Sequence, residues 1–195
     1  MSPAPALQCV PADGVAPTPW RNGGGQTREL LTRPARGPWL LRISLADIDR
    51  DGPFSAFPAT QRWFGVVAGA GVALRFGDDV RELTPDSAPL QFDGAAAPGC
   101  SLLDGPTRDL NLMLRSGAGL MCAVQANRIW EEAFNERGLF TLGEGILHRH
   151  GHEAVHLLPR TLVWFLGPGP CRFEPRAPGR AGWWLAWSGD AVQQE

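Results

Sequence analysis

Residues 39–46 read Trp-Leu-Leu-Arg-Ile-Ser-Leu-Ala, and this stretch decides the fold class. Apolar residues occupy positions 39, 41, 43 and 45, whereas arginine, serine and alanine occupy positions 42, 44 and 46. Successive side chains of a β-strand point to opposite faces. The alternation therefore predicts a strand with one apolar face and one small or polar face.

Glycine and proline occur frequently along the rest of the chain, which favours short strands. Its 195 residues include 24 glycines and 18 prolines, which interrupt the apolar stretches. Further strands are predicted at residues 81–84, 90–92, 109–115, 121–125, 154–158, 161–166 and 182–187. Residues 63–69 and 71–76 predict a hairpin around Ala70. The Pro/Ala-rich first 19 residues predict either a loosely ordered lead-in or an edge strand near residues 7–10. The sequence therefore predicts an all-β fold.

One segment departs from this pattern. Apolar residues at positions 129, 130, 133 and 134 have helical spacing, which predicts a short helix between Asn127 and Gly138. No linker divides the chain, so we expect a single domain over residues 1–195. Its two β-barrel-like halves, about 1–117 and 118–195, would form one compact unit and meet near Gly117-Ala118-Gly119.

Charge and hydropathy exclude several classes of protein. The net charge is -2 and the arginines are scattered, so there is no basic stripe for nucleic acid. No apolar run approaches the ~20 residues that span a bilayer, and residues 1–6 lack the features of a secretion signal. We therefore expect a cytoplasmic protein. The four cysteines lie far apart in sequence, which favours reduced thiols over disulfides or a zinc site.

Two missing residue types exclude further chemistry. All 18 basic residues are arginine, so Schiff-base catalysis, pyridoxal-phosphate attachment and a P-loop lack the lysine they need. The chain has no tyrosine, which excludes a phenol as a general acid or base. No Gly-x-Ser-x-Gly motif surrounds any serine, so the sequence also offers no recognisable nucleophile.

Residues 20–29 read Trp-Arg-Asn-Gly-Gly-Gly-Gln-Thr-Arg-Glu. Three consecutive glycines allow positive φ and close approach to the main chain. Asn22 and Thr27 offer neutral donors and acceptors. Arg21 and Arg28 offer planar forks for a carboxylate, and Glu29 could anchor one of them. The segment predicts a binding wall or a glycine-rich turn; a phosphate-binding loop is disfavoured because a strand follows and lysine is absent.

Two further segments carry candidate binding residues. Residues 51–62 end in Arg62, which could hold a carboxylate with Ser55 as a second donor and Phe57 as an apolar wall. The other interpretation is a structural loop whose phenylalanines fill the core. In residues 105–113, Asn111 shares a strand face with an aspartate and a methionine and could form part of a pocket wall or satisfy nearby backbone.

Histidines and tryptophans cluster in the C-terminal third. Histidines at positions 148, 150, 152 and 156 alternate as in some metal sites, but further ligands are lacking downstream. We expect an exposed loop there, with no metal and no cofactor. The tryptophans at positions 183, 184 and 187 are expected to close the core of a barrel rather than to cover a ligand.

Four of these segments, taken in order, resemble the HutD/Ves family. They are residues 20–29, 41–48, 52–58 with Arg62, and 109–113, and together they cover roughly residues 15–117. The chain departs from the family at Leu41, where tryptophan is common, and at Ala59, where glycine is common. The resemblance implies a cupin or bicupin fold, an RmlC-like jelly roll, without obvious metal ligands. It also implies a link with bacterial histidine utilisation, in a sensing or flux-limiting role.

The resemblance and the motifs together predict a non-catalytic protein that binds a small carboxylate and modulates histidine utilisation. Urocanate or a formyl or formimino derivative of glutamate would suit the motifs. Arg62, alone or together with Arg42, would take the carboxylate, and Phe57 would pack against the flat part of the ligand. The predicted ligand-binding residues are Asn22, Thr27, Glu29, Arg42, Ser55, Phe57, Arg62 and Asn111.

Two other functions stay open at this point. A cupin-type isomerase or hydrolase would need a proton-transfer group, for which Glu29 or a histidine from 148 to 156 is the candidate. A purely protein-binding role would need a large exposed apolar surface. The expected partner is a small carboxylate, with no nucleic acid and no membrane. A homodimer through an edge strand is compatible with such a fold.

Overall fold

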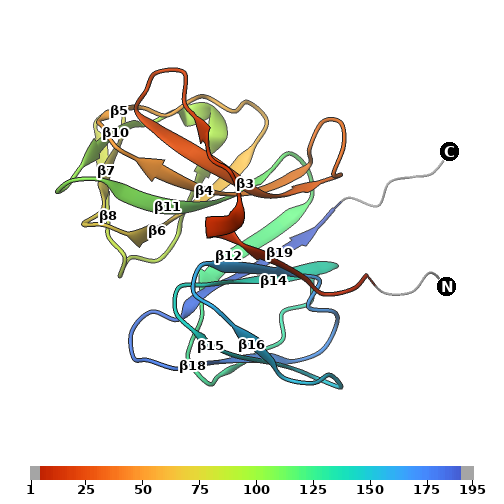
Figure 1. The fold of residues 1–195 in the computed structure, drawn as a ribbon. Coiled ribbons are helices and arrows are strands. Elements are labelled where there is room, and N and C mark those ends of the chain that lie inside the picture. The colour runs from red at the N-terminus through yellow and green to blue at the C-terminus, as the bar shows by residue number, and fades with distance from the viewer. Residues whose placement is uncertain (1–4, 190–195) are drawn as a thin grey trace, which may run out of the picture. The chain divides into compact units, whose positions relative to one another are not determined.

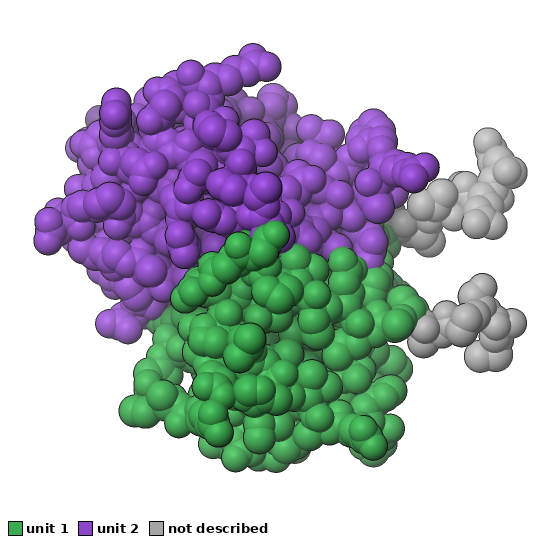
Figure 2. Space-filling model, viewed as in Figure 1, with its two compact units in different colours: residues 1–14, 117–195 green, residues 15–116 purple. Residues whose placement is uncertain are grey.

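The structure is a computed structural model that describes residues 5–189. Within that range the chain forms strands β1 to β19 and two short 3₁₀ helices, Ala12–Gly14 and Gly94–Ala96, so the all-β prediction is confirmed (Figure 1). The chain separates into two compact units (Figure 2). Unit 2 comprises residues 15–116, and unit 1 comprises the described parts of 1–14 and 117–195.

Unit 2 consists of two antiparallel sheets. The larger sheet has the order β2-β3-β4-β11-β6-β9, and its central strands run side by side in Figure 1. Its strands are β2 (Thr18–Pro19), β3 (Gly25–Arg33), β4 (Leu41–Ile48), β11 (Thr107–Leu114), β6 (Gln61–Ala68) and β9 (Leu90–Asp93). The smaller sheet has the order β5-β10-β7-β8, with β5 (Gly52–Pro53), β10 (Gly99–Leu102), β7 (Val72–Phe76) and β8 (Asp79–Leu83).

The inward face of the larger sheet of unit 2 is part apolar and part polar. On β6, Phe64 and Val66 join an apolar core with residues of the smaller sheet, such as Leu74. Arg62 shares their face because side chains alternate along a strand. On β4, Ile48 belongs to the same core, and the small or polar positions 42, 44 and 46 share its face. The alternation predicted for residues 39–46 is thus present, and its polar face is directed into unit 2.

Unit 1 also consists of two antiparallel sheets. One has the order β1-β17-β14-β19-β12, with β1 (Gln8–Pro11), β17 (Thr161–Trp164), β14 (Glu136–Thr141), β19 (Gly182–Ser188) and β12 (Ala118–Ala123). The other has the order β13-β18-β15-β16, with β13 (Ile129–Trp130), β18 (Cys171–Pro175), β15 (Gly145–Arg149) and β16 (Val155–Leu157).

The interior of unit 1 is filled by apolar side chains. Trp130 and Trp184 stack with ring centroids 4.7 Å apart and planes inclined by 5°. Arg137 is buried beside them, and its guanidinium donates hydrogen bonds to the carbonyl oxygens of Gly167 and Gly169. The predicted burial of the C-terminal tryptophans at positions 183, 184 and 187 is confirmed, since each is at most 8% exposed.

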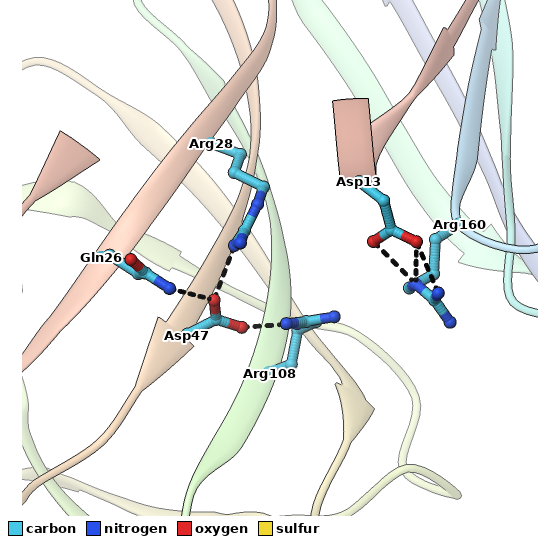
Figure 3. Close-up of polar contacts among 6 residues, drawn as sticks. All are labelled: Asp13, Gln26, Arg28, Asp47, Arg108 and Arg160. Carbon is cyan, nitrogen blue, oxygen red and sulfur yellow. Dashed lines mark hydrogen bonds and ion pairs between the residues drawn. The ribbon is translucent and has the colours of Figure 1, made fainter. Parts of the chain in front are cut away.

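The N-terminal segment belongs to unit 1 rather than to unit 2. The sequence predicts that residues 1–117 form one half, but β1 pairs with β17, with Gln8 opposite Trp164. An ion pair between Asp13 and Arg160 follows directly after this pairing (Figure 3). Local sequence cannot reveal this arrangement, because the partner strand begins about 150 residues later in the chain. The second segment of unit 1 begins at Gly117, at the glycine-rich junction.

Two other local predictions are wrong. Residues 127–138 form no helix; β13 and a loop lie there, because Trp130 finds its stacking partner on β19. The strands around Ala70 exist as β6 and β7, but they do not pair as a hairpin. β6 pairs with β11 and β9, whereas β7 pairs with β10 and β8. The chain crosses between sheets through Gly69 and Gly71, both at positive φ.

No helix among the residues that the structure describes is long and apolar enough to cross a membrane.

Candidate functional site

Unit 2 contains a cavity of about 630 Å³ that opens between polar and aromatic walls. All eight residues predicted to bind a ligand line this cavity. They are Asn22, Thr27, Glu29, Arg42, Ser55, Phe57, Arg62 and Asn111. Four separate sequence motifs therefore meet at one place.

Strand register explains why these residues meet. In β3, β4 and β11, Glu29, Ser44 and Asn111 lie opposite one another as a cross-strand row. The next row places Arg42 of β4 opposite Met113 of β11, which in turn lies opposite Arg62 of β6. Cross-strand neighbours on one face lie about 5 Å apart, so two rows of inward residues form a continuous wall.

Arg62 lines the cavity, and it is only 8% exposed. Its Nε donates a hydrogen bond of 2.8 Å to Oδ1 of Asn111. Its guanidinium carbon lies 4.5 Å from the ring centroid of Phe54 and 5.4 Å from that of Phe92. Burial lowers the pKa of Arg62 to about 10, although the charge of Asp109 opposes this effect. The side chain therefore remains a cation at neutral pH.

No ion pair of Arg62 is present among residues 5–189, and its hydrogen bond to Asn111 uses only Nε. The terminal nitrogens of a guanidinium form a planar fork that matches a carboxylate. Arg62 is therefore a buried cation packed against aromatic rings, and its two terminal nitrogens remain available to a ligand in the cavity. It is the strongest anion-binding element of the site.

Asp109 is a buried acid next to this site, and it is not among the eight residues that the sequence predicts to bind a ligand. It is 1% exposed, and its Oδ2 accepts a hydrogen bond of 2.5 Å from Nδ2 of Asn111. Burial raises the pKa of Asp109 to about 7, while Arg62 and the hydrogen bond from Asn111 act in the opposite direction. The available signal was its position on the same strand face as Asn111, two residues away.

Residues near the mouth of the cavity are held by one another. Nε of Arg42 donates to Oε2 of Glu29 at 3.0 Å, so the predicted anchor acts on Arg42 rather than on Arg21 or Arg28. The indole nitrogen of Trp20 donates to the hydroxyl oxygen of Thr27 at 2.7 Å. These contacts fix the wall, and they occupy part of the hydrogen-bonding capacity that a ligand would use.

The glycine triplet shapes this wall by two different means. Gly23 has a φ of +67°, which favours glycine, and the amide of Gly24 donates to Oδ1 of Asn22 at 3.0 Å. Gly25 is needed for close packing, because a Cβ there would lie 2.1 Å from the carbonyl oxygen of Asp47. The triplet is thus a tight, closely packed turn between the cavity-lining residues Asn22 and Thr27.

Arg28 does not line the cavity. It belongs to a polar cluster around Asp47, which also accepts hydrogen bonds from Gln26 and Arg108 (Figure 3). Burial acts to raise the pKa of Asp47, but the hydrogen bonds from Arg108, Arg28 and Gln26 outweigh it and hold this pKa below its ordinary value. The carboxylate that Arg28 binds is therefore an internal one.

The remaining wall residues complete a mixed lining. Ser55 is exposed at the mouth, and Phe57 is half-buried with its amide bonded to the carbonyl oxygen of Gly94. Phe54, Ser44 and the residues at positions 18–21, 46, 53 and 113 also line the cavity. Phe54 immediately precedes Ser55, and sequence alone could not distinguish which phenylalanine meets the arginine.

The histidine cluster lies in unit 1, on and beside β15 and β16. His148 is in a strand rather than in the predicted loop, and its Nε2 lies 3.3 Å from Oε2 of Glu174. Nε2 of His156 lies 2.7 Å from Oε1 of Glu144. Within the described range, no three or more histidine, cysteine or acidic side chains gather closely enough to hold a metal ion.

Comparisons with known proteins give a consistent assignment. A family model described as HutD matches residues 12–172. The chain is 38% identical over 110 residues to an uncharacterized 21.2 kDa protein in the hutC 3' region of Pseudomonas putida, a match covering 55% of this chain and 57% of that protein. It is 33% identical over 97 residues to protein Ves of Cronobacter sakazakii, a match covering 49% of this chain and 54% of that protein. The chain thus spans a little over half the length of these curated relatives.

Solved structures share the fold over nearly the whole chain. HutD from Pseudomonas fluorescens SBW25 has a TM-score of 0.82 at 24% identity, covering 95% of this chain and 100% of that one. A conserved protein of unknown function from Pseudomonas aeruginosa PAO1 has a TM-score of 0.80 at 25% identity, with the same coverage. A mutant of oxalate decarboxylase from Bacillus subtilis has a TM-score of 0.60 at 8% identity. The match covers 93% of this chain and 77% of the oxalate decarboxylase chain.

These likenesses confirm the predicted cupin-type fold with two β halves. The family model covers most of the chain, and it includes every residue of the cavity lining. The chain belongs to the HutD family.

Proposed function

We propose that this protein binds a small carboxylate in the cavity of unit 2 and thereby modulates histidine utilisation without catalysing a reaction. The observation that carries the proposal is Arg62, a buried cation in the lining of the cavity that forms no ion pair with any described residue. A charged group removed from water is costly unless it is paired. Asp109 favours the charge of Arg62 through space but forms no ion pair with it, so an anionic ligand would supply the direct partner.

The size and lining of the cavity suit a small organic acid. Its volume of about 630 Å³ lies within the range of small-molecule sites. A carboxylate on the fork of Arg62 would leave the rest of the ligand between Phe57 and the hydroxyl groups of Ser44 and Ser55. Arg42 lies in the same cross-strand row as Arg62 and could meet a second acidic or amide group.

Urocanate and N-formyl or N-formimino glutamate fit this lining as candidate ligands. Urocanate has one carboxylate and a flat ring, whereas the glutamate derivatives have two carboxylates and an amide-like end. The link to histidine utilisation rests on membership of the HutD family and on a relative encoded in the hutC 3' region. A cytoplasmic location follows from this role as part of the proposal, and a homodimer stays a prediction.

A binding role is favoured over catalysis by the titratable groups of the lining. Glu29 is the acid in the lining, and it is bonded to Arg42 with about half of its side chain exposed. No histidine or cysteine of the described chain lines the cavity. Proton transfer to a bound substrate would require a positioned group with a suitable pKa.

Isothermal titration calorimetry with urocanate and N-formyl-L-glutamate tests the proposal. We expect saturable binding to the wild type and a loss of at least about 30-fold in affinity for Arg62→Ala, because truncating a buried charge partner costs 2 kcal/mol or more. Arg108→Gln is the matched control: this arginine is on the same sheet but bonds Asp47 and does not line the cavity. Folded wild type that binds neither acid would contradict the proposal.

A further inference from the structure

A chain of two hydrogen bonds connects Arg62 to a buried acid. Arg62 donates to Oδ1 of Asn111, and Nδ2 of Asn111 donates to Oδ2 of Asp109. The other carboxyl oxygen of Asp109, Oδ1, is buried without a hydrogen-bond partner among the described residues. An ionised carboxylate in such a place lacks the full set of donors that would replace water.

The surroundings of Asp109 place opposing influences on its charge. Arg62 of β6 favours the ionised form, whereas burial and the negative charge of Asp47 on β4 disfavour it. The thiol of Cys100 on β10 also faces this region, and burial raises its pKa to about 12, so it stays neutral. Arg62 is thus the cation that balances Asp109.

A carboxylate ligand would change this balance. It would place a second negative charge beside Arg62, which already compensates Asp109. Like charges that share one cation in a buried site favour protonation of one of them. A ligand carboxylate held by the terminal nitrogens of Arg62 would keep its charge, because charge-assisted hydrogen bonds stabilise it. Asp109 has fewer hydrogen bonds, since its Oδ1 has no partner among the described residues, so Asp109 is the group expected to gain the proton.

We infer that binding of a carboxylate at Arg62 is coupled to uptake of one proton by Asp109, with Asn111 as the link between the two side chains. The inference rests on the proposed function, because it requires an anion at Arg62. The ligand enters as an anion, and one proton passes from solvent to Oδ1 of Asp109, which neutralises that carboxylate. Asp109 is therefore a positioning residue that acts on the ligand through Arg62 and Asn111.

The coupling predicts that affinity rises as pH falls, because linkage between proton and ligand is reciprocal. In the free protein the pKa of Asp109 is about 7. If the bound ligand raises it by about one unit, the dissociation constant increases about five-fold between about pH 6 and pH 8. A site without such coupling would bind a fully ionised acid equally well over this interval.

Calorimetry of the wild type with N-formyl-L-glutamate tests the inference, since both carboxyl groups of this probe are ionised above about pH 6. Titrations near about pH 7.5 in two buffers with different ionisation enthalpies give the number of protons bound. With a pKa of about 7 in the free protein and about one unit higher in the complex, we expect net uptake of about half a proton at this pH, together with the pH dependence above. Binding without proton uptake and with constant affinity overturns the inference but leaves the proposed function intact.

Two variants assign the proton to its residue. Asp109→Asn keeps the shape and an oxygen acceptor for Asn111, and it should abolish both proton uptake and pH dependence. Asp47→Asn removes another buried carboxylate of the same sheet, one that bonds Arg28 and Arg108 instead. It should retain both proton uptake and pH dependence, displaced to lower pH because the charge of Asp47 no longer raises the pKa of Asp109. Proton uptake that persists in a folded Asp109→Asn would overturn the assignment.

If N-formyl-L-glutamate, urocanate and glutarate all fail to bind wild type, the proposed function and this inference fall together.

Discussion

Asp109 should make the stability of the free protein depend on pH in a defined direction. Its pKa is raised from 3.8 to about 7 in the folded chain, so the folded state binds more protons than the unfolded state between these values. Stability is therefore greatest below the unfolded pKa, and it is lost as pH rises toward the folded pKa. Arg62 does not interfere, because its pKa is lowered only to about 10, above this interval.

The magnitude follows from the two pKa values. Between about pH 5 and pH 8, a carboxyl with pKa 3.8 unfolded and about 7 folded loses about 2.5 kcal/mol of stabilisation. Asp109→Asn cannot titrate, so its free energy of unfolding relative to wild type should increase by that amount across the same interval.

Urea unfolding of wild type and Asp109→Asn at several pH values measures this difference directly. Other titrating groups are common to both proteins and cancel when the two curves are subtracted. Curves that stay parallel within about 0.5 kcal/mol between about pH 5 and pH 8 would refute the reasoning. They would mean that Asp109 ionises at an ordinary pKa despite its burial.

The glycine triplet and the cysteines give two further predictions. Gly25→Ala should lower the free energy of unfolding by about 1–3 kcal/mol, because its Cβ would meet the carbonyl oxygen of Asp47 at 2.1 Å. Gly24→Ala should cost less, since the nearest atom is in a side chain at 3.3 Å; equal losses in chemical denaturation would contradict this distinction. Iodoacetamide should modify the exposed Cys9 first. Cys100 should react only on unfolding, because burial raises its pKa to about 12. Mass spectrometry measures the order of modification, and an early reaction at Cys100 would contradict this prediction.

The binding wall was predictable because each motif carries its own alternation. Arg42, Arg62 and Asn111 occupy inward positions of neighbouring strands, and a period of two identifies such positions from sequence. The resemblance to a family linked these motifs to one site. Register then explains their proximity, but register itself could not be read from the separate segments.

The missed features depend on contacts between distant parts of the chain. Local spacing around Trp130 predicts a helix, although the stacking partner of this residue lies 54 positions later, at Trp184. The strands on either side of Ala70 looked like a hairpin, although each pairs within a different sheet. The importance of Asp109 depends on how completely it is buried, and burial is a property of the packed sheets rather than of the motif.

A crystal structure of the protein with N-formyl-L-glutamate would test the central claim most directly. The account predicts a carboxylate in the cavity of unit 2, with its oxygens about 3 Å from the terminal nitrogens of Arg62. The hydrogen bonds that join Arg62, Asn111 and Asp109 should remain in place. A ligand bound outside this cavity, or inside it with no contact to Arg62, would contradict the account.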